Sequence, residues 1–457
     1  MTNSALTKNL RKKLVRAVHT PSLVPQYLAD KRSLSGGGQS KLSWALYRVA
    51  GVLEHKKARK LLQLASSRAA LHDFAGAASL YAQAIREDPE TSEMYATGMV
   101  MSKSGSLQDQ FFAALLDNIR TDELRAMMKY IAKVPRIYQP SQFWLYFSTY
   151  NALQIESAGA ENFKRTVNKN YFNWTGEADV NIQLSALEDL TNPRSGQEGE
   201  SETGVLDCTL KKNHQRMLEL LYRYAQSVDL MGLLAKVAEP ELGNPIGLRI
   251  EGRTITQDLC NTIMDWNTIF QHAKPRLANR PIVYELGAGH GRMGYALLKA
   301  FPGARYVVID IPPALYVSQW YLTRLFPELK AVRFKENWSQ PEFNKAFSDA
   351  SLIFLSPDQA EYLPGRSCDL FINICSLQEM KLDQVRNWFR HIDRLCGGHF
   401  YTKQYYEHRN ALDEESINRS DYPINPRWRM VFDRKSPTFP SLFESIYQIS
   451  EARTLDP

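Results

Sequence analysis

The chain has 457 residues, of which 44% are hydrophobic and 23% are charged, a composition typical of a folded globular protein and not of a disordered one. The net charge of +7 is concentrated in residues 1–60, which contain thirteen Lys and Arg residues against two acidic residues, Asp30 and Glu54. The rest of the chain is slightly acidic, so we expect no nucleic-acid partner.

Cysteine and histidine spacing excludes several other classes of protein. The five cysteines are odd in number and no two have the CxxC spacing, which predicts a reducing, cytoplasmic environment without a disulfide framework. The histidines form no metal-binding pattern, and we predict no metal site. No run of about 18 apolar residues suggests a transmembrane helix, and we expect no secretory signal.

Residues 1–40 form a basic arm. Leu6, Leu10, Leu14 and Val18 recur every four residues with basic residues between them, a pattern that predicts a short amphipathic helix. Two interpretations stay open: the helix contacts an anionic membrane surface, or it docks on its own protein. Residues 33–40 (SLSGGGQS) have the composition of a flexible linker.

Residues 41–105 and 106–275 are predicted to be helical. In the first region, small and aromatic residues fall as in one unit of a tetratricopeptide repeat: Leu64, Ala65, Ala77, Tyr81, Ala84 and Pro89. Because a solenoid needs about three such units, we predict a single helical hairpin. The second region is expected to cap the substrate site, with helices at 110–119, 122–134, 141–156, 211–236 and 254–273 and a loop at 190–205. We expect His214 on a helix surface, and a Thr256-Gln257-Asp258 cap before the last helix.

The pattern changes after Pro281 to short apolar runs that alternate with helical segments. The runs lie at 282–287, 305–310, 352–356, 369–376 and 399–405, and the helical segments at 293–301, 314–326 and 382–395. Continuous apolar strands are typical of a parallel sheet covered on both faces. We therefore predict a doubly wound, mostly parallel, Rossmann-like α/β domain at 276–457, preceded by an α-helical N-terminal region. Residues 405–457 are rich in aromatic and basic residues and could form a wall for an acceptor. Alternatively, or in addition, 428–433 and 442–450 are the last two strands of the sheet.

A glycine-rich loop follows the first of these strands. It runs from Glu285 through Gly287, Ala288, Gly289, His290 and Gly291 to Gly294 and opens a predicted helix. Glycine permits a sharp turn and lets a ligand approach bare backbone. Asp310 ends the next strand, 25 residues after Glu285, where an acid can accept hydrogen bonds from ribose hydroxyls. The alternative for Asp310 is a helix N-cap before Pro312.

Two cofactors compete for this loop. The spacing of Gly289, Gly291 and Gly294 satisfies the dinucleotide fingerprint, whereas the carboxylate of Glu285 would repel a pyrophosphate and suits a ligand that carries an ammonium and a sulfonium. We therefore favour S-adenosyl-L-methionine (SAM) over NAD(P). The acidic residue, the glycines and Asp310 resemble class I SAM-dependent methyltransferases over about residues 280–405. The resemblance implies cofactor contacts at Glu285, Gly287, Ala288, Gly289, Gly291, Asp310, Asp358 and Asn373.

Further segments resemble a bacterial family of sugar O-methyltransferases. They lie at 138–144, 159–174, 243–245, 373–380 and 400–405. This resemblance implies methyl transfer to a sugar hydroxyl in polysaccharide or glycolipid biosynthesis. Attack by a hydroxyl calls for a general base, and the candidates are Glu379, after the fourth strand, and His290, in the glycine loop. Gln378, Lys403 and Gln404 are expected to bind acceptor hydroxyls.

Three alternatives stay open. The first is an NAD(P)-dependent sugar oxidoreductase that uses the same glycine loop. The second is a methyltransferase that acts on a protein or a small molecule, because the loop does not determine the acceptor. The third is a binding protein whose methyltransferase domain has lost its activity.

Overall fold

The structure is a computed structural model that describes residues 41–88, 113, 116–166, 177–191, 204–205, 212–277, 280–410 and 413–449. The chain forms two compact units, Met1–Asn118 and Ile119–Pro457. Several sequence predictions lie wholly or partly outside the described residues: the amphipathic helix at 6–18, the linker at 33–40, the packing role of Pro89, the helix at 110–119 and the loop at 190–205.

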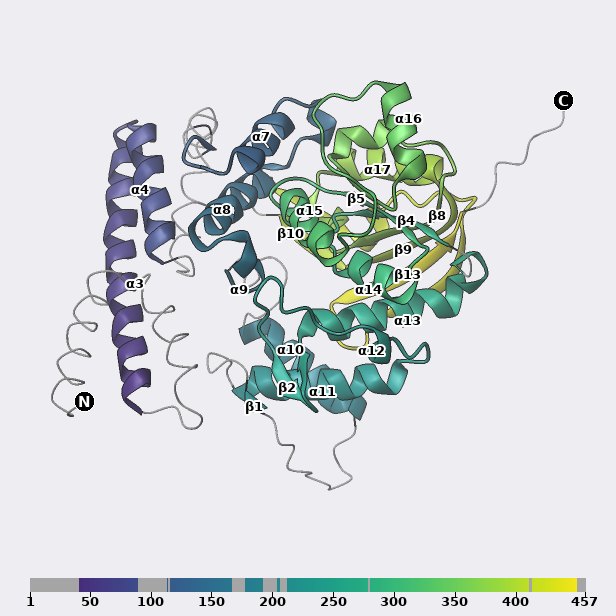
Figure 1. Cartoon of the computed structure of the whole chain (residues 1–457), viewed down its shortest axis with the longest axis horizontal. Coiled ribbons are helices and arrows are strands. Elements are labelled where there is room, and N and C mark those ends of the chain that lie inside the picture. Colours follow the sequence, from purple (N-terminus) through teal and green to yellow (C-terminus); the bar gives the residue numbers. More distant parts are fainter. Residues whose placement is uncertain are drawn as a thin grey trace. The chain divides into compact units, whose positions relative to one another are not determined.

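The first unit contains a helical hairpin, as the sequence predicts. Helix α3 (Lys41–Ala70) packs against α4 (Phe74–Glu87), and Figure 1 shows the two side by side. The Asp73 carboxylate caps α4 by accepting the backbone N–H of Gly76 at 2.9 Å. The predicted packing residues Ala65 and Tyr81 are buried, but Leu64 is 46% exposed. The expectation for Leu64 was wrong because adjacent helical positions point about 100° apart.

The second unit is built on an eight-stranded sheet of order β12-β13-β9-β8-β4-β5-β7-β6. Its parallel strands are β4 (Ile282–Leu286), β5 (Arg305–Ile309), β6 (Ala331–Val332), β7 (Leu352–Leu355), β8 (Cys368–Ile374) and β9 (Cys396–Tyr405). Strands β12 (Arg429–Lys435) and β13 (Leu442–Gln448) extend it antiparallel beyond β9. All five predicted buried strands are present, and both C-terminal segments are strands.

Helices cover both faces of this sheet. Figure 1 shows α16 (Gln340–Asp349) and α17 (Leu382–Leu395) on one side, and α13 (Gln257–Leu277) and α14 (Arg292–Ala300) on the other. Helix α15 (Ala314–Leu325) packs beside α14. The core under α16 and α17 includes Leu286, Phe371 and Phe400. Because side chains alternate along a strand, the residues next to these in sequence point toward α13 and α14.

The sheet order places a switch point between β4 and β8. From β4 the chain continues to β5, then to the edge strand β6 and back to β7, all on one side of β4. It then crosses to β8 and β9 on the other side. In open α/β sheets, ligands bind outside the carboxyl ends of the strands at such a point. The glycine loop, which follows β4, lies at this point.

The remaining elements precede the sheet or follow its loops. The helices are α7 (Asp122–Ile131), η1 (Arg136–Tyr138), α8 (Gln142–Ala158), η2 (Ala160–Asn162), α9 (Phe163–Thr166), α10 (Glu177–Thr191), α11 (Lys212–Val228), α12 (Leu233–Lys236), η3 (Pro357–Tyr362), η4 (Leu377–Glu379) and η5 (Arg419–Asp421). The strands are β1 (Gly204–Val205), β2 (Leu248–Ile250), β3 (Arg253–Ile255), β10 (Glu407–Asn410) and β11 (Glu415–Asn418). None of the helices within the described ranges has the length and apolarity needed to cross a bilayer.

Two helix predictions need correction, and one cap is confirmed. The predicted helix at 211–236 is divided into α11 and α12, because the Asp229 carboxylate accepts the N–H groups of Leu233 and Leu234 at 2.9 and 2.8 Å. His214 is buried, not at a helix surface, and burial lowers its pKa to about 4. Thr256 caps α13, since its hydroxyl accepts the N–H of Leu259 at 3.0 Å.

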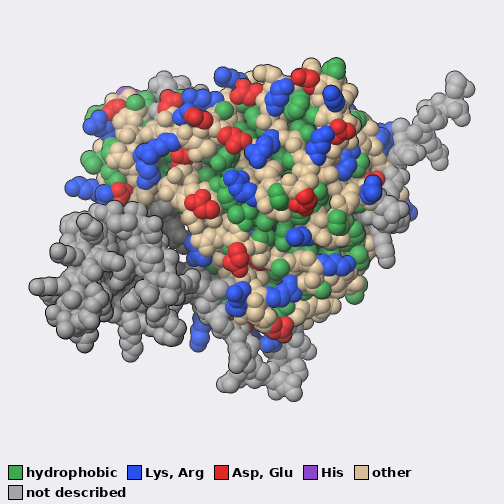
Figure 2. Space-filling model, in the orientation of Figure 1, with side chains coloured by type: hydrophobic (Ala, Val, Ile, Leu, Met, Phe, Trp, Pro, Cys, Tyr) green, Lys and Arg blue, Asp and Glu red, His purple; other side chains and the backbone are tan. Residues whose placement is uncertain are grey.

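Charge is distributed evenly on the visible surface. On the face drawn in Figure 2, Lys and Arg side chains are interspersed with Asp and Glu side chains over the described residues.

Candidate functional site

The glycine loop has a backbone that only glycine accommodates well. Gly287, Gly289 and Gly291 have φ values of 69°, 61° and 87°, in the left-handed region that is costly for residues with a Cβ. A Cβ at Gly287 would also lie 2.3 Å from the hydroxyl oxygen of Ser376. The chain therefore passes from β4 into α14 by a tight turn whose main chain is left bare.

Asp310 fastens this turn to the neighbouring strand. It directly follows β5, and its carboxylate accepts the N–H of Gly289 at 2.8 Å and that of Ile311 at 2.7 Å. A carboxylate offers about four acceptor positions, and these two bonds use two of them. Burial raises the pKa of Asp310 to about 7, against the effect of these two bonds. The alternative role as a helix cap is wrong, because α15 begins only at Ala314.

Glu285 is buried one residue before the end of β4. The Tyr306 hydroxyl donates a hydrogen bond to its carboxylate. Burial raises the pKa of Glu285 to about 8; Arg292 opposes the shift, and the negative charge of Asp310 adds to it. Glu285 and Asp310 therefore interact electrostatically, as their positions at the ends of adjacent strands predict.

Glu379 completes a group of three acidic side chains at this edge. It ends η4 after β8, where the Ser141 hydroxyl donates to its carbonyl at 3.3 Å. Burial raises the pKa of its carboxyl group to about 8; a hydrogen bond from the Trp144 indole opposes the shift, and the charge of Asp310 adds to it. We call Glu285, Asp310 and Glu379 the carboxylate cluster.

Arg292 acts on Glu285 through its charge, but its direct ion pair is with Asp265. No ion pair within the described residues involves Glu285, Asp310 or Glu379. Across the same part of the chain, no three His, Cys, Asp or Glu side chains are grouped as metal ligands. The cluster therefore favours a cationic ligand, which would relieve the repulsion between its members.

Asn373 joins the ends of three strands. Its amide donates to the carbonyl of Leu286 at 2.9 Å and to the Ser376 hydroxyl at 2.5 Å, and its carbonyl oxygen accepts from Gln404 at 2.5 Å. These bonds connect the ends of β4, β8 and β9. Asn373 thereby supports the turn that contains Gly287.

Asp358 and Gln378, two further predicted residues, are bonded to other parts of the protein. The Asp358 carboxylate accepts from the hydroxyls of Tyr130 on α7 and of Ser356, both at 2.6 Å. The side-chain oxygen of Gln378 accepts the backbone N–H of Tyr405 at 2.6 Å. Asp358 thus links η3 to α7, and Gln378 links η4 to the end of β9.

Lys403 points toward α13, whereas the next residue, Gln404, points toward Asn373. The Lys403 ammonium lies 3.0 Å from the Asp265 carboxylate and 3.3 Å from that of Glu444. Arg292 lies 2.9 Å from the other oxygen of Asp265. Burial lowers the pKa of Lys403, but the two carboxylates outweigh burial and raise it. The Lys403 side chain therefore belongs to a buried ion-pair network under the glycine loop.

His290 is enclosed on the α15 side of the loop. Its ring lies 5.2 Å from that of Phe163 and 5.5 Å from that of Tyr321, and its Nε2 lies 3.9 Å from an Asp258 oxygen. Burial, together with Lys164 and Arg292, lowers its pKa well below the ordinary value. His290 also lines a cavity of about 20 Å³, which is large enough for about one water molecule.

Sequence analysis missed Trp144 and Asp265. Trp144 looked like an ordinary apolar position of a helix, and its contact with Glu379 joins residues 235 positions apart. Asp265 carried a detectable signal, since it is an acid among the apolar residues Ile263, Trp266 and Ile269 of α13. A charged residue on a buried stripe requires a partner, but the sequence does not reveal which one.

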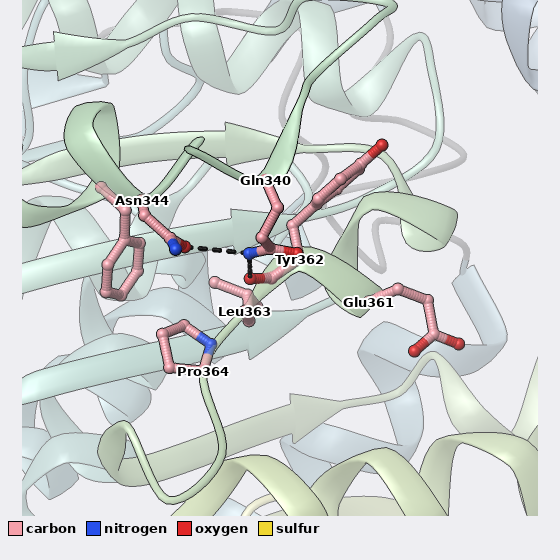
Figure 3. Close-up of a pocket in the computed structure, with 7 residues that line it drawn as sticks. Gln340, Asn344, Glu361, Tyr362, Leu363 and Pro364 are labelled. Carbon is pink, nitrogen blue, oxygen red and sulfur yellow. Dashed lines mark hydrogen bonds between the residues drawn. The ribbon is translucent and has the colours of Figure 1, made fainter. Parts of the chain in front are cut away.

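Figure 3 shows a pocket elsewhere on the second unit. It has a volume of about 350 Å³ and lies between α16 and η3. The Gln340 amide crosses between the two elements, with bonds to Asn344 at 2.9 Å and to the Tyr362 carbonyl at 3.0 Å. No predicted site residue lines this pocket, so it is separate from the carboxylate cluster.

Comparisons with known proteins give weak likenesses. No protein-family model matches the sequence, and no curated protein matches it. A solved structure described as a sarcosine dimethylglycine methyltransferase from Galdieria sulphuraria is 11% identical and has a TM-score of 0.30; the match covers 42% of this chain and 86% of that one. An arsenic(III) SAM methyltransferase from Chlamydomonas reinhardtii is 16% identical with a TM-score of 0.25, and the match covers 39% of this chain and 66% of that one. A SAM-dependent methyltransferase from Aquifex aeolicus is 10% identical with a TM-score of 0.24, and the match covers 43% of this chain and 100% of that one. Likenesses with TM-scores this low do not indicate a function for the chain.

Proposed function

We propose that the chain is a SAM-dependent methyltransferase whose cofactor lies along the glycine loop. The observation that supports this most directly is the carboxylate cluster. Three buried acidic groups with raised pKa values surround a bare main-chain turn at the switch point of the sheet. A ligand with ammonium and sulfonium charges stabilises the ionised form of these groups, whereas a pyrophosphate dianion would be repelled by it. The cluster thus favours SAM over NAD(P).

The residues present fit such a cofactor. Gly287, Ala288, Gly289 and Gly291 offer main chain without bulky side chains, and a Cβ at Gly287 would fill the turn. Asp310 is assigned to the ribose hydroxyls, which its remaining acceptor positions would bind. Glu285 is positioned to attract the amino group through its charge.

Asp358 and Asn373 are assigned supporting positions around this cofactor. Asp358 is bonded to α7 beside the adenine side of the proposed site, and Asn373 holds the turn at the methionine side. When bound, SAM supplies a methyl group on a positively charged sulfur. The remaining work of the site is to orient the acceptor and remove its proton.

Glu379 is the proposed general base. Its pKa of about 8 lies near neutral pH. A base with such a pKa is partly ionised and still has a useful driving force for accepting the proton. The acceptor oxygen forms its bond to the methyl carbon as the bond from that carbon to sulfur breaks, and the hydroxyl proton passes to the Glu379 carboxylate. The indole N–H of Trp144 orients this carboxylate. His290, with its lowered pKa and aromatic contacts, is the weaker candidate.

A sugar hydroxyl is the proposed acceptor, in polysaccharide or glycolipid biosynthesis in the cytoplasm. The support is the resemblance of segments such as 138–144 and 373–380, and the first of these leads into Trp144 and the second contains Glu379. We do not extend acceptor binding to Lys403 or Gln378, because their polar groups are bonded to Asp265, Glu444 and Tyr405. Transfer to another small molecule is the second candidate.

Calorimetric titration of the purified full chain with S-adenosylhomocysteine (SAH) and, separately, with NAD tests the cofactor. We expect saturable heat with SAH and none with NAD. Heat with NAD alone would overturn the proposal and favour the oxidoreductase. Tritiated-methyl transfer from SAM to extracted glycans, lipids and proteins then identifies the acceptor class.

A further inference from the structure

Helix α8 lies between Glu379 and the glycine loop. At its start, Trp144 bonds to the Glu379 carboxylate, and Ser141 bonds to the Glu379 carbonyl. At its end the chain continues through η2 to Phe163, whose ring contacts His290 of the glycine loop at 5.2 Å. The helix therefore passes along the edge of the sheet where the carboxylate cluster lies.

One stripe of α8 contains polar groups without partners. Trp144, Ser148 and Asn151 are spaced by four and three residues, so they share one face of the helix. Ser148 is 2% exposed and Asn151 is fully buried. Among the residues that the structure describes, no hydrogen-bond partner is found for the Ser148 hydroxyl oxygen or for the oxygen and nitrogen of the Asn151 amide. We call Ser148 and Asn151 the polar stripe.

The polar stripe differs from a neighbouring buried hydroxyl group on the same helix, that of Thr149. Thr149 is 1% exposed, but its hydroxyl donates to the Leu145 carbonyl of its own helix at 2.9 Å. Polar groups that are buried without partners destabilise a protein, and most are paired. The three atoms of the stripe therefore have hydrogen-bonding capacity that a bound molecule could use.

The chemistry of these atoms selects the ligand class. The Asn151 amide offers donors and an acceptor, and the Ser148 hydroxyl can do either. The stripe has no positively charged side chain to attract a carboxylate or phosphate, and the ionised form of Glu379 would repel either one. An ammonium has no acceptor, so it would leave the Asn151 N–H groups unpaired. Hydroxyl groups, which both donate and accept, pair with every atom of the stripe.

We propose that the polar stripe binds hydroxyl groups of a polyhydroxylated acceptor, beside the hydroxyl that Glu379 deprotonates. This inference rests on the proposed function. Ser148 and Asn151 lie about 6 and 10.5 Å from Trp144 along the helix axis, at a rise of about 1.5 Å per residue. The stripe is thus long enough to engage more than one hydroxyl of the same molecule and to determine which of them reaches Glu379.

The test uses the full chain, with Asn151→Leu and Ser148→Ala as variants and Thr149→Val as the matched control. The substrates are a panel of methyl glycosides of common hexoses and deoxyhexoses, and the readout is tritiated-methyl transfer from SAM. We expect Asn151→Leu to raise KM for the glycoside about tenfold or more, and Ser148→Ala about threefold, for the loss of hydrogen bonds. In Asn151→Leu and Ser148→Ala, the kcat at saturating glycoside and the affinity for SAH should stay near the wild-type values. In Thr149→Val, the KM should stay near the wild-type value as well.

A second readout separates binding from folding. Because Asn151 is buried without a partner, Asn151→Leu should raise the midpoint of thermal unfolding of the ligand-free protein. A purely structural role for Asn151 predicts the reverse, a lower midpoint with unchanged KM.

The outcomes distinguish this inference from the proposed function. Unchanged glycoside KM in Asn151→Leu, an equal rise in Thr149→Val, or a wild-type protein that binds SAH yet methylates no glycoside would overturn the role of the polar stripe. Failure of the wild-type protein to bind SAH would instead overturn the proposed function.

Discussion

Asp310→Asn isolates the charge of the residue that connects the glycine loop to the adjacent strand. The substitution keeps the shape of the side chain but replaces one acceptor oxygen with an NH₂ donor. Asp310 now accepts from the N–H groups of Gly289 and Ile311 at 2.8 and 2.7 Å. An amide can accept only one of these bonds without turning its own donor toward the other N–H. It also leaves fewer acceptor positions for ribose hydroxyls.

The expected loss of cofactor affinity follows from these bonds. A hydrogen bond to a charged group contributes about 1.5–3 kcal/mol. The variant loses the charge-assisted ribose contact and disturbs one loop bond, so we expect SAH binding to weaken by about 3 kcal/mol. At about 1.4 kcal/mol per tenfold change in Kd, this is about 100-fold.

Isothermal calorimetry with SAH measures the change, at a pH above the Asp310 pKa of about 7. The matched control is Asp369→Asn. The Asp369 carboxylate also accepts a strand N–H, that of Ile282 at 2.9 Å, but it lies at the beginning of β4 and β8, on the opposite edge of the sheet. We expect the control to bind SAH as wild type does. An Asp310→Asn protein that binds SAH with wild-type affinity would refute the ribose assignment.

Three further changes probe the carboxylate cluster and the loop. SAM affinity should fall as the pH drops from about 8 to below 7. Glu285, Asp310 and Glu379 have pKa values of about 8, 7 and 8, so they take up protons in this range, and a cationic ligand must displace those protons. Calorimetry across this pH range measures the change, and a flat profile would contradict the expectation. The same raised pKa values mean that the ligand-free fold binds more protons than the unfolded chain, so its free energy of unfolding should decrease as the pH rises through 7 to 8, which urea titration measures. Glu379→Gln should lower kcat by about 10²–10⁴ in the transfer assay while SAH affinity changes little; wild-type kcat would exclude Glu379 as the base. Gly287→Ala should abolish SAH binding, because the new Cβ would lie 2.3 Å from the Ser376 hydroxyl and the left-handed φ costs about 1–2 kcal/mol for a residue with a side chain. Adding Ser376→Gly to this variant should restore part of the binding. If no binding returns, the contact with Ser376 is not the cause of the loss.

The sequence by itself determined the α/β domain and the cofactor edge. Buried parallel strands are continuous apolar runs, so β4, β5, β7, β8 and β9 are visible one by one. The glycine loop and Asp310 are equally visible, because the conformation of a tight turn and the end of a strand depend on residues that are close in sequence. Elements with weaker patterns escaped: β6 has two residues, and α16 is largely polar.

The tertiary structure alone decided which of these residues act together. Lys403 was expected to face the acceptor, but the register of β9 turns it toward Asp265 and Glu444. His214 was expected at the surface, and packing buries it. The bond from Trp144 to Glu379 and the unpaired atoms of Ser148 and Asn151 depend on where α8 lies. Local patterns determine the conformation of a segment, whereas charge pairing and burial depend on neighbours that the chain brings together only when it folds.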